Sequence, residues 1–82
     1  MSACRDWLAA VNATATAATR KAMTGAAVLG DSLGYTVELR DGAQVYVGRQ
    51  CCKYCARSEA ANIVAGRLEN GTPLCDYAKA AP

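Results

Sequence analysis

The sequence predicts an α+β fold in which two helices pack on one face of an antiparallel β-hairpin, in the order helix, hairpin, helix. Three patterns support this prediction: a helical apolar stripe in residues 1–25, two short β-rich runs within residues 35–47, and a second helical stripe in residues 56–70. A lone hairpin is marginally stable in water, so we expect both helices to cover its aliphatic face. The chain has 82 residues, which is enough for a single domain over residues 1–82.

The first helix is expected to begin at Ser2, whose side chain can cap it, and to run to about Met23, with Gly25 as its C-terminal cap. Arg20 and Lys21 would lie in its last turn, where positive charge interacts favourably with the helix dipole. The first half of its apolar stripe is bulky and the second half contains only alanine. The stripe consists of Cys4, Trp7, Leu8, Val11, Ala15, Ala18 and Ala22.

The hairpin is the clearest element in the sequence, and its register can be argued. A two-residue loop at Asp41-Gly42 would place aliphatic residues on both faces of the strands. A three-residue loop, with Gly42 in a left-handed conformation, gathers them on one face, and we therefore predict this second register. Its pairs are Leu39 with Ala43, Val37 with Val45, and Tyr35 with Val47.

The segments on either side of the hairpin are expected to connect it to the helices. Residues 26–34 are interpreted as a loop that holds Val28 and Leu29 against the core. A cysteine-rich connector at residues 49–55 leads into the second helix, which the Asn-Gly pair at residues 70–71 ends. Residues 78–82 are expected to be a frayed tail.

Composition and charge exclude several classes of function. The formal net charge of +2 is too small for the basic patch that nucleic-acid binding usually needs. The first residues do not form a basic region followed by an apolar stretch, and no run approaches the roughly 18 apolar residues of a membrane span. We therefore expect a soluble cytoplasmic protein with no membrane partner.

The chain contains no histidine, which excludes Ser-His and Cys-His nucleophile pairs as well as mixed Cys/His zinc sites. Gly30-Asp31-Ser32-Leu33 reproduces the string that carries the nucleophilic serine in the GDSL family of lipase-like hydrolases. That serine needs a histidine base, so we interpret the four residues as a loop. The usual catalytic constellations cannot be assembled from these residue types, and we expect that the protein is not an enzyme.

Five cysteines leave three interpretations open. Cys52 and Cys55 have the spacing of zinc ligands, and Cys75 together with Cys4 or Cys51 would complete a four-thiolate site. We expect buried or half-buried thiols and no cofactor, because Cys52 lies on the apolar stripe of the second helix. A zinc site at Cys4, Cys52, Cys55 and Cys75 is the first alternative and a disulfide is the second.

The zinc alternative is accompanied by a resemblance. The stretch from Cys52 to Ala78 resembles the zinc finger of the DksA/TraR transcription factors, which has a CxxC, an Arg-Leu pair and a second CxxC after a leucine. The matching residues are Cys52, Cys55, Arg67, Leu68, Leu74 and Cys75, and Ala78 stands at the place of the last cysteine. The resemblance implies a regulatory zinc module.

The polar face of the hairpin is the candidate binding surface. Exposed tyrosine and arginine are the residue types that most often anchor a protein interface. We expect a larger protein or protein complex to be the partner. The candidate partner-binding residues are Glu38, Arg40, Gln44, Tyr46 and Arg49.

The chain is similar in its small size and its alanine- and threonine-rich composition to bacteriophage accessory proteins. Met23-Thr24-Gly25, Asp41-Gly42 and the helix from Ala56 resemble, in that order, the W family of head–tail joining proteins of lambdoid phages. In size and hairpin style the chain also resembles anti-CRISPR inhibitors. These resemblances imply a phage protein that docks on a larger complex, as an inhibitor of a host defence complex or, alternatively, as a head–tail connector.

Overall fold

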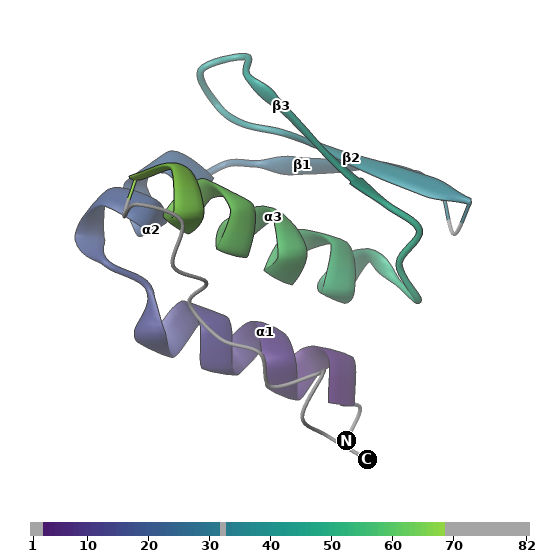
Figure 1. Cartoon of the computed structure of the whole chain (residues 1–82), viewed down its shortest axis with the longest axis horizontal. Coiled ribbons are helices and arrows are strands. Elements are labelled where there is room, and N and C mark those ends of the chain that lie inside the picture. Colours follow the sequence, from purple (N-terminus) through teal and green to yellow (C-terminus); the bar gives the residue numbers. More distant parts are fainter. Residues whose placement is uncertain (1–2, 32, 69–82) are drawn as a thin grey trace.

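The computed structural model describes residues 3–31 and 33–68, and it confirms the α+β class. Three helices and three strands follow one another along these residues (Figure 1). They are α1 (Ala3–Thr14), α2 (Ala17–Met23), β1 (Ala27–Asp31), β2 (Gly34–Glu38), β3 (Gln44–Gly48) and α3 (Lys53–Leu68). The strands form one antiparallel sheet in the order β1-β2-β3.

The helices lie on one side of the sheet, and α3 and α1 form two successive layers there (Figure 1). α3 contacts all three strands, and α1 packs against α3. In Figure 1, α3 therefore lies between the sheet and α1, and the two helices run side by side with their N-terminal ends at the same end of the molecule. Among the described residues, the other face of the sheet is open.

The expectation of one continuous first helix over residues 1–25 is wrong, because the chain breaks after Thr14. Thr16 is extended (φ −71°, ψ 165°) and its Oγ1 accepts a hydrogen bond from the backbone N–H of Thr19 at 3.3 Å, which makes Thr16 the N-cap of α2. Threonine competes with helical backbone bonding in this way. The expected end at about Met23 is confirmed. Thr24 is the C-cap residue, and Gly25 follows it with a φ of +76°.

The expectation that residues 26–34 form a loop is also wrong, since five of them form β1. Val28 pairs with Val37 of β2, and Leu29 pairs with Thr36. Gly30 and Asp31 of the GDSL string lie at the end of β1, and Asp31 Oδ1 accepts a hydrogen bond from the N–H of Leu33 at 2.9 Å. Ser32 lies outside the described residues. The first strand makes the predicted two-stranded hairpin a three-stranded sheet.

The predicted hairpin register is confirmed at its turn end and wrong at its far end. Val37 pairs with Val45, the N–H of Leu39 donates to the carbonyl of Ala43 at 2.7 Å, and Gly42 has a φ of +91°. Tyr35, however, pairs with Gly48 and not with Val47, because the register shifts between Tyr35 and Thr36. Such a shift inserts an extra residue in β3 and bends the strand.

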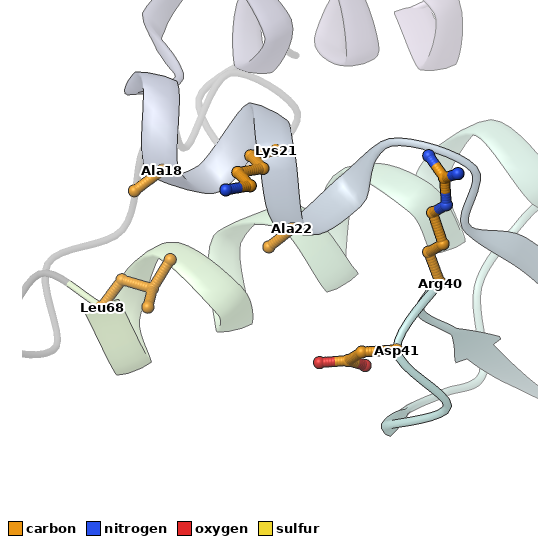
Figure 2. A pocket seen from close by; sticks show the side chains of 6 residues that line it. All are labelled: Ala18, Lys21, Ala22, Arg40, Asp41 and Leu68. Atoms are coloured by element: carbon orange, nitrogen blue, oxygen red, sulfur yellow. The ribbon is translucent and has the colours of Figure 1, made fainter.

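A hollow of about 560 Å³ lies beside α2, where the β2–β3 turn and the end of α3 approach it (Figure 2). Arg40 extends along one side of it, and its methylenes would contact a Cβ placed on Gly25 at 3.6 Å. The lining residues are Ala18, Lys21, Ala22, Arg40, Asp41 and Leu68.

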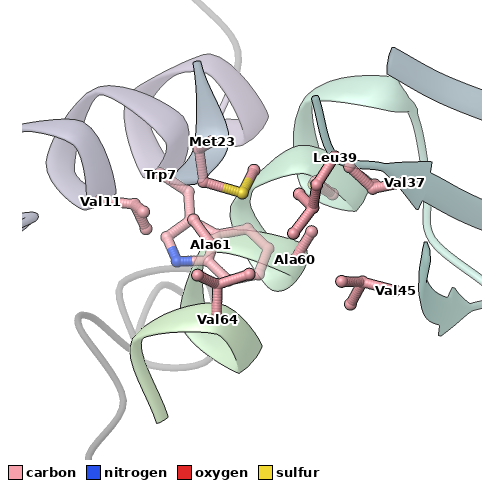
Figure 3. Close-up of a cluster of buried hydrophobic side chains, with 10 residues drawn as sticks. Trp7, Val11, Met23, Val37, Leu39, Val45, Ala60, Ala61 and Val64 are labelled. Carbon is pink, nitrogen blue, oxygen red and sulfur yellow. The ribbon is translucent and has the colours of Figure 1, made fainter. Parts of the chain in front are cut away.

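The core is divided by α3, which buries small residues on two sides (Figure 3). Trp7 and Val11 of α1 pack on one side, while Val37 and Val45 of the sheet pack on the other. Alanine lets both layers approach the helix axis closely. The buried alanines of α3 are Ala56, Ala60, Ala61 and Ala65. The helix begins at Lys53, three residues before the expected start at residue 56.

Candidate metal centre

Four cysteines meet where α1 and α3 begin, and we refer to Cys4, Cys51, Cys52 and Cys55 as the thiol cluster. All four Sγ atoms lie within 4.8 Å of one another. Cys4 is in the first turn of α1, Cys51 and Cys52 are in the connector after β3, and Cys55 is in the first turn of α3. The four are free thiols.

The sulfur separations fit a single metal ion. Cys51 Sγ lies 3.1 Å from Cys4 Sγ, 3.1 Å from Cys55 Sγ and 3.9 Å from Cys52 Sγ. Four sulfurs at about 2.3 Å from a tetrahedral zinc ion are separated by about 3.8 Å. Changes of up to about 1 Å in these separations would therefore give the thiol cluster tetrahedral geometry around an ion.

The fold brings these sulfurs together through the first turns of two helices. The carbonyl of Cys52 accepts the N–H of Ala56 at 3.1 Å, so Cys52 occupies the N-cap position of α3. Cys55 lies three residues further and therefore on the same side of the first turn. On α1, Cys4 lies one turn before Trp7, which is buried against α3, and this anchor holds Cys4 beside the connector.

The surroundings of the thiol cluster favour negative charge. The N-terminal ends of α1 and α3 both lie there, and helix dipoles are positive at that end. Arg5, Arg49 and Lys53 each lie within two residues of a cluster cysteine. The guanidinium of Arg5 also lies 5.1 Å from the centre of the Tyr54 ring, which links the two helices beside the cluster.

The thiols differ in how readily they ionise. Burial opposes ionisation of Cys52, but its sulfur accepts hydrogen bonds from the backbone amides of Cys55 and Tyr54, and the pKa of this thiol falls below its ordinary value. The hydrogen bond with Cys51 raises the pKa of Cys4. Burial raises the pKa of Cys55. Cys52 is therefore the cluster thiol whose pKa is lowered by the fold.

The structure brings together three of the four cysteines expected as ligands, namely Cys4, Cys52 and Cys55. It adds Cys51, which the sequence offered only as a substitute for Cys4. The signal was present in the adjacent Cys51-Cys52 pair, which places a second sulfur beside the CxxC. Cys75, the remaining candidate, lies outside the described residues.

The candidate partner-binding residues do not all share one surface. Glu38, Gln44 and Tyr46 lie on the open side of the sheet, where Gln44 Nε2 donates to Glu38 Oε2 at 3.4 Å. Arg40 lies beside the hollow of Figure 2, and Arg49 lies between β3 and the thiol cluster.

The open side of the sheet gains apolar residues from β1. The expectation that Leu29 packs against the core is wrong, because Leu29 lies on this open side, whereas Val28 does pack against the core. Thr36 pairs with Leu29 on one side and with Tyr46 on the other, so the three side chains share a face. Leu29 is 46% exposed and Tyr46 is 70% exposed. We call this surface the outer face. Its residues are Ala27, Leu29, Thr36, Glu38, Gln44 and Tyr46.

Comparisons of the chain with protein-family models, with curated proteins and with solved structures found no match. None of the helices that the structure describes has the length and apolar character required to cross a bilayer.

Proposed function

We propose that the chain is a non-enzymatic protein-binding module whose fold is held by a structural zinc ion at the thiol cluster. The observation that carries the proposal is the meeting of four sulfurs within 4.8 Å, contributed by segments that are far apart in the sequence. Four protein thiolates leave no open position on a tetrahedral ion, and closed sites of this kind are structural and not catalytic.

The donor set selects the metal by its chemistry. Thiolates are soft ligands that favour zinc and iron–sulfur clusters over calcium or magnesium. Zinc with four thiolates carries a net charge of −2, which Arg5, Arg49 and Lys53 would offset. When bound, zinc would supply a cross-link between α1 and the start of α3. The chain's own residues place the sulfurs, and Cys51 is the ligand that the solvent reaches.

Metal titration with a matched pair of variants tests the zinc proposal. Reduced protein is reconstituted with Zn²⁺ for metal analysis and with Co²⁺, whose tetrahedral thiolate complexes absorb in the visible and near ultraviolet. We expect one ion per chain in the wild type. Cys51→Ser, which removes an exposed sulfur and little packing, should weaken the thiolate bands and the affinity, whereas Cys75→Ser should change neither. Failure of the wild type to bind either ion would reject the proposal.

A second proposal concerns docking on a larger protein, and it is supported by the outer face. Leu29 and Tyr46 are large, exposed and adjacent to Thr36, and the described helices all lie on the opposite side of the sheet (Figure 1). Tyrosine is one of the residue types that are enriched among interface hot spots. In line with the resemblance to phage inhibitors, we propose that the partner belongs to a bacterial defence complex, with a phage particle as the alternative partner.

Affinity capture from bacterial lysate tests the docking proposal. Wild-type protein should retain one stoichiometric partner, identified by mass spectrometry. Tyr46→Ala combined with Leu29→Ser should lose it, because both side chains lie on the outer face. Arg40→Ala, which alters the far side of the sheet by the hollow, should retain it. Capture of no specific partner by the wild type, or equal capture by both variants, would remove the outer face from the proposal.

A further inference from the structure

Cys51 occupies the central position among the cluster sulfurs. Its Sγ lies 3.1 Å from both Cys4 Sγ and Cys55 Sγ, which is closer than the ligands of a tetrahedral ion need to be. It is also the one exposed thiol of the cluster, whereas Cys4 and Cys52 are half-buried and Cys55 is buried. An oxidant that arrives from solvent therefore meets Cys51 first.

We propose that Cys4 and Cys51 form a peroxide-sensitive oxidation site, at which a disulfide replaces the metal as the link between α1 and the connector. The proposal rests on the zinc site proposed above and adds its regulation. The substrate is a hydroperoxide, which is small enough to reach Cys51 and carries the two oxidising equivalents that one disulfide requires.

The choice of Cys4 over Cys55 as the second sulfur follows from burial. Both sulfurs are equally near to Cys51, but Cys55 is only 5% exposed and its contact with Cys51 is partly buried. The Cys4–Cys51 contact, in contrast, lies on the exposed side of the cluster. Closing a 3.1 Å separation to the bond length of about 2.05 Å moves the short connector and the start of α1, and leaves α3 in place.

The reaction balances in two steps. The Cys51 thiolate attacks the hydroperoxide, its sulfur becomes a sulfenic acid, and the leaving oxygen departs as hydroxide or alkoxide. The Cys4 thiolate then attacks that sulfur, the S–S bond forms, and a second hydroxide leaves. Two thiolates have lost two electrons in total and one peroxide O–O bond has been reduced. The metal keeps only two of its four protein ligands, so its affinity falls and it is released.

The positions of lysine and arginine make the product easy to identify. Trypsin cleaves after Arg5, Arg49, Lys53 and Arg57, so it separates Cys4 (residues 1–5), Cys51 with Cys52 (residues 50–53), and Cys55 (residues 54–57). A Cys4–Cys51 disulfide joins the first peptide to the second. A Cys51–Cys55 disulfide joins the second to the third.

The experiment treats zinc-loaded and metal-free full-length protein with hydrogen peroxide, follows zinc release with a chromogenic chelator, and maps tryptic peptides without reduction. We expect peptides 1–5 and 50–53 to become joined in step with zinc release. Two variants show which sulfur of peptide 50–53 forms the disulfide with Cys4. Cys52→Ser should still form it, whereas Cys51→Ser should reduce the amount of disulfide between peptides 1–5 and 50–53 by about tenfold or more.

Three other outcomes are distinguishable. A dominant link between peptides 50–53 and 54–57, or zinc release without the 1–5 link, would overturn the oxidation site while leaving the zinc site standing. Retention of the link in Cys51→Ser would overturn the role of Cys51. If the protein binds no zinc, the proposed function fails, and the peptide map of the metal-free protein still decides whether Cys4 and Cys51 are the pair that oxidises.

Discussion

The guanidinium of Arg57, in the second turn of α3, donates a hydrogen bond to the backbone carbonyl of Met23, the last residue of α2, at 3.1 Å. A second bond runs to the carbonyl of Ala26 at 3.2 Å. The end of a helix leaves carbonyls without partners inside the helix, and one half-buried arginine supplies partners here. Arg57 thereby joins α3 to the segment that leads from α2 into the sheet.

Removal of this arginine should destabilise the fold. Arg57→Met keeps much of the apolar stem but removes both donors. The carbonyl of Met23 keeps the N–H of Ala26 at 3.1 Å, so the loss is that of two hydrogen bonds from a charged group at a partly buried site, which costs about 1–3 kcal/mol. Urea unfolding in reducing buffer measures the change in free energy of unfolding. Arg67→Met, at an exposed position in the last turn of the same helix, is the matched control and should change it by less than about 0.5 kcal/mol. Equal losses in the two variants would contradict this role for Arg57.

The break between α1 and α2 depends on one hydroxyl. Thr16→Ala removes the oxygen that accepts the N–H of Thr19, and loss of an N-cap costs about 1 kcal/mol. Thr16→Ser keeps that oxygen and should retain most of the stability. The difference between the two variants in free energy of unfolding, measured in urea, is the contribution of the cap to stability. If alanine were as stable as serine, the break would not depend on capping by Thr16.

Two glycines with similar positive φ angles should respond differently to alanine. Gly30 in β1 has a φ of +98°, and a Cβ there would collide with the carbonyl oxygen of Gly34 across the turn. Gly42 in the β2–β3 turn has a φ of +91°, but a Cβ there would meet nothing within 4 Å. Gly42→Ala should cost about 1–2 kcal/mol from its left-handed conformation alone, and Gly30→Ala should cost more. Thermal unfolding of the pair provides the comparison, and an equal loss would argue against the close pairing of β1 with β2.

The same glycines explain how much of the sheet could be predicted from the sequence. The β2–β3 hairpin was predictable because Asp41-Gly42 and alternating aliphatic residues are local signals that agree with each other. β1 was missed because Gly30 interrupts its short apolar run. Val28 is a strand residue only because Val37 lies beside it in the sheet. Strand propensity of this kind depends on neighbours that are distant in sequence.

The candidate site was predictable only in part for a similar reason. Spacing alone pairs Cys52 with Cys55, since both lie at the start of one helix. The approach of Cys4 depends on α1 packing parallel to α3 through Trp7, and no local pattern encodes that orientation. The first-helix stripe indicated that Trp7 is buried but not which element it contacts.

The separation of 47 residues between Cys4 and Cys51 sets the size of the stabilisation expected from zinc. A cross-link that closes a loop of this length removes about 4 kcal/mol of conformational freedom from the unfolded chain. Wild-type protein should therefore unfold at a clearly higher urea concentration with zinc than with a chelator. Cys4→Ser should lose most of this zinc-dependent gain, because the three remaining sulfurs span only residues 51–55 and close no long loop.

The variant Cys75→Ser tests whether the zinc ion is held by the thiol cluster or by a set of ligands that includes Cys75. If the ion is held by the thiol cluster, Cys75→Ser should keep the full zinc-dependent gain, while Cys4→Ser does not. The opposite ranking would replace Cys4 by Cys75 in the site. Both variants exchange one sulfur for one oxygen. A general effect of losing a cysteine would therefore lower the stability of both variants equally, with zinc and with chelator, and the zinc-dependent difference in stability would not change.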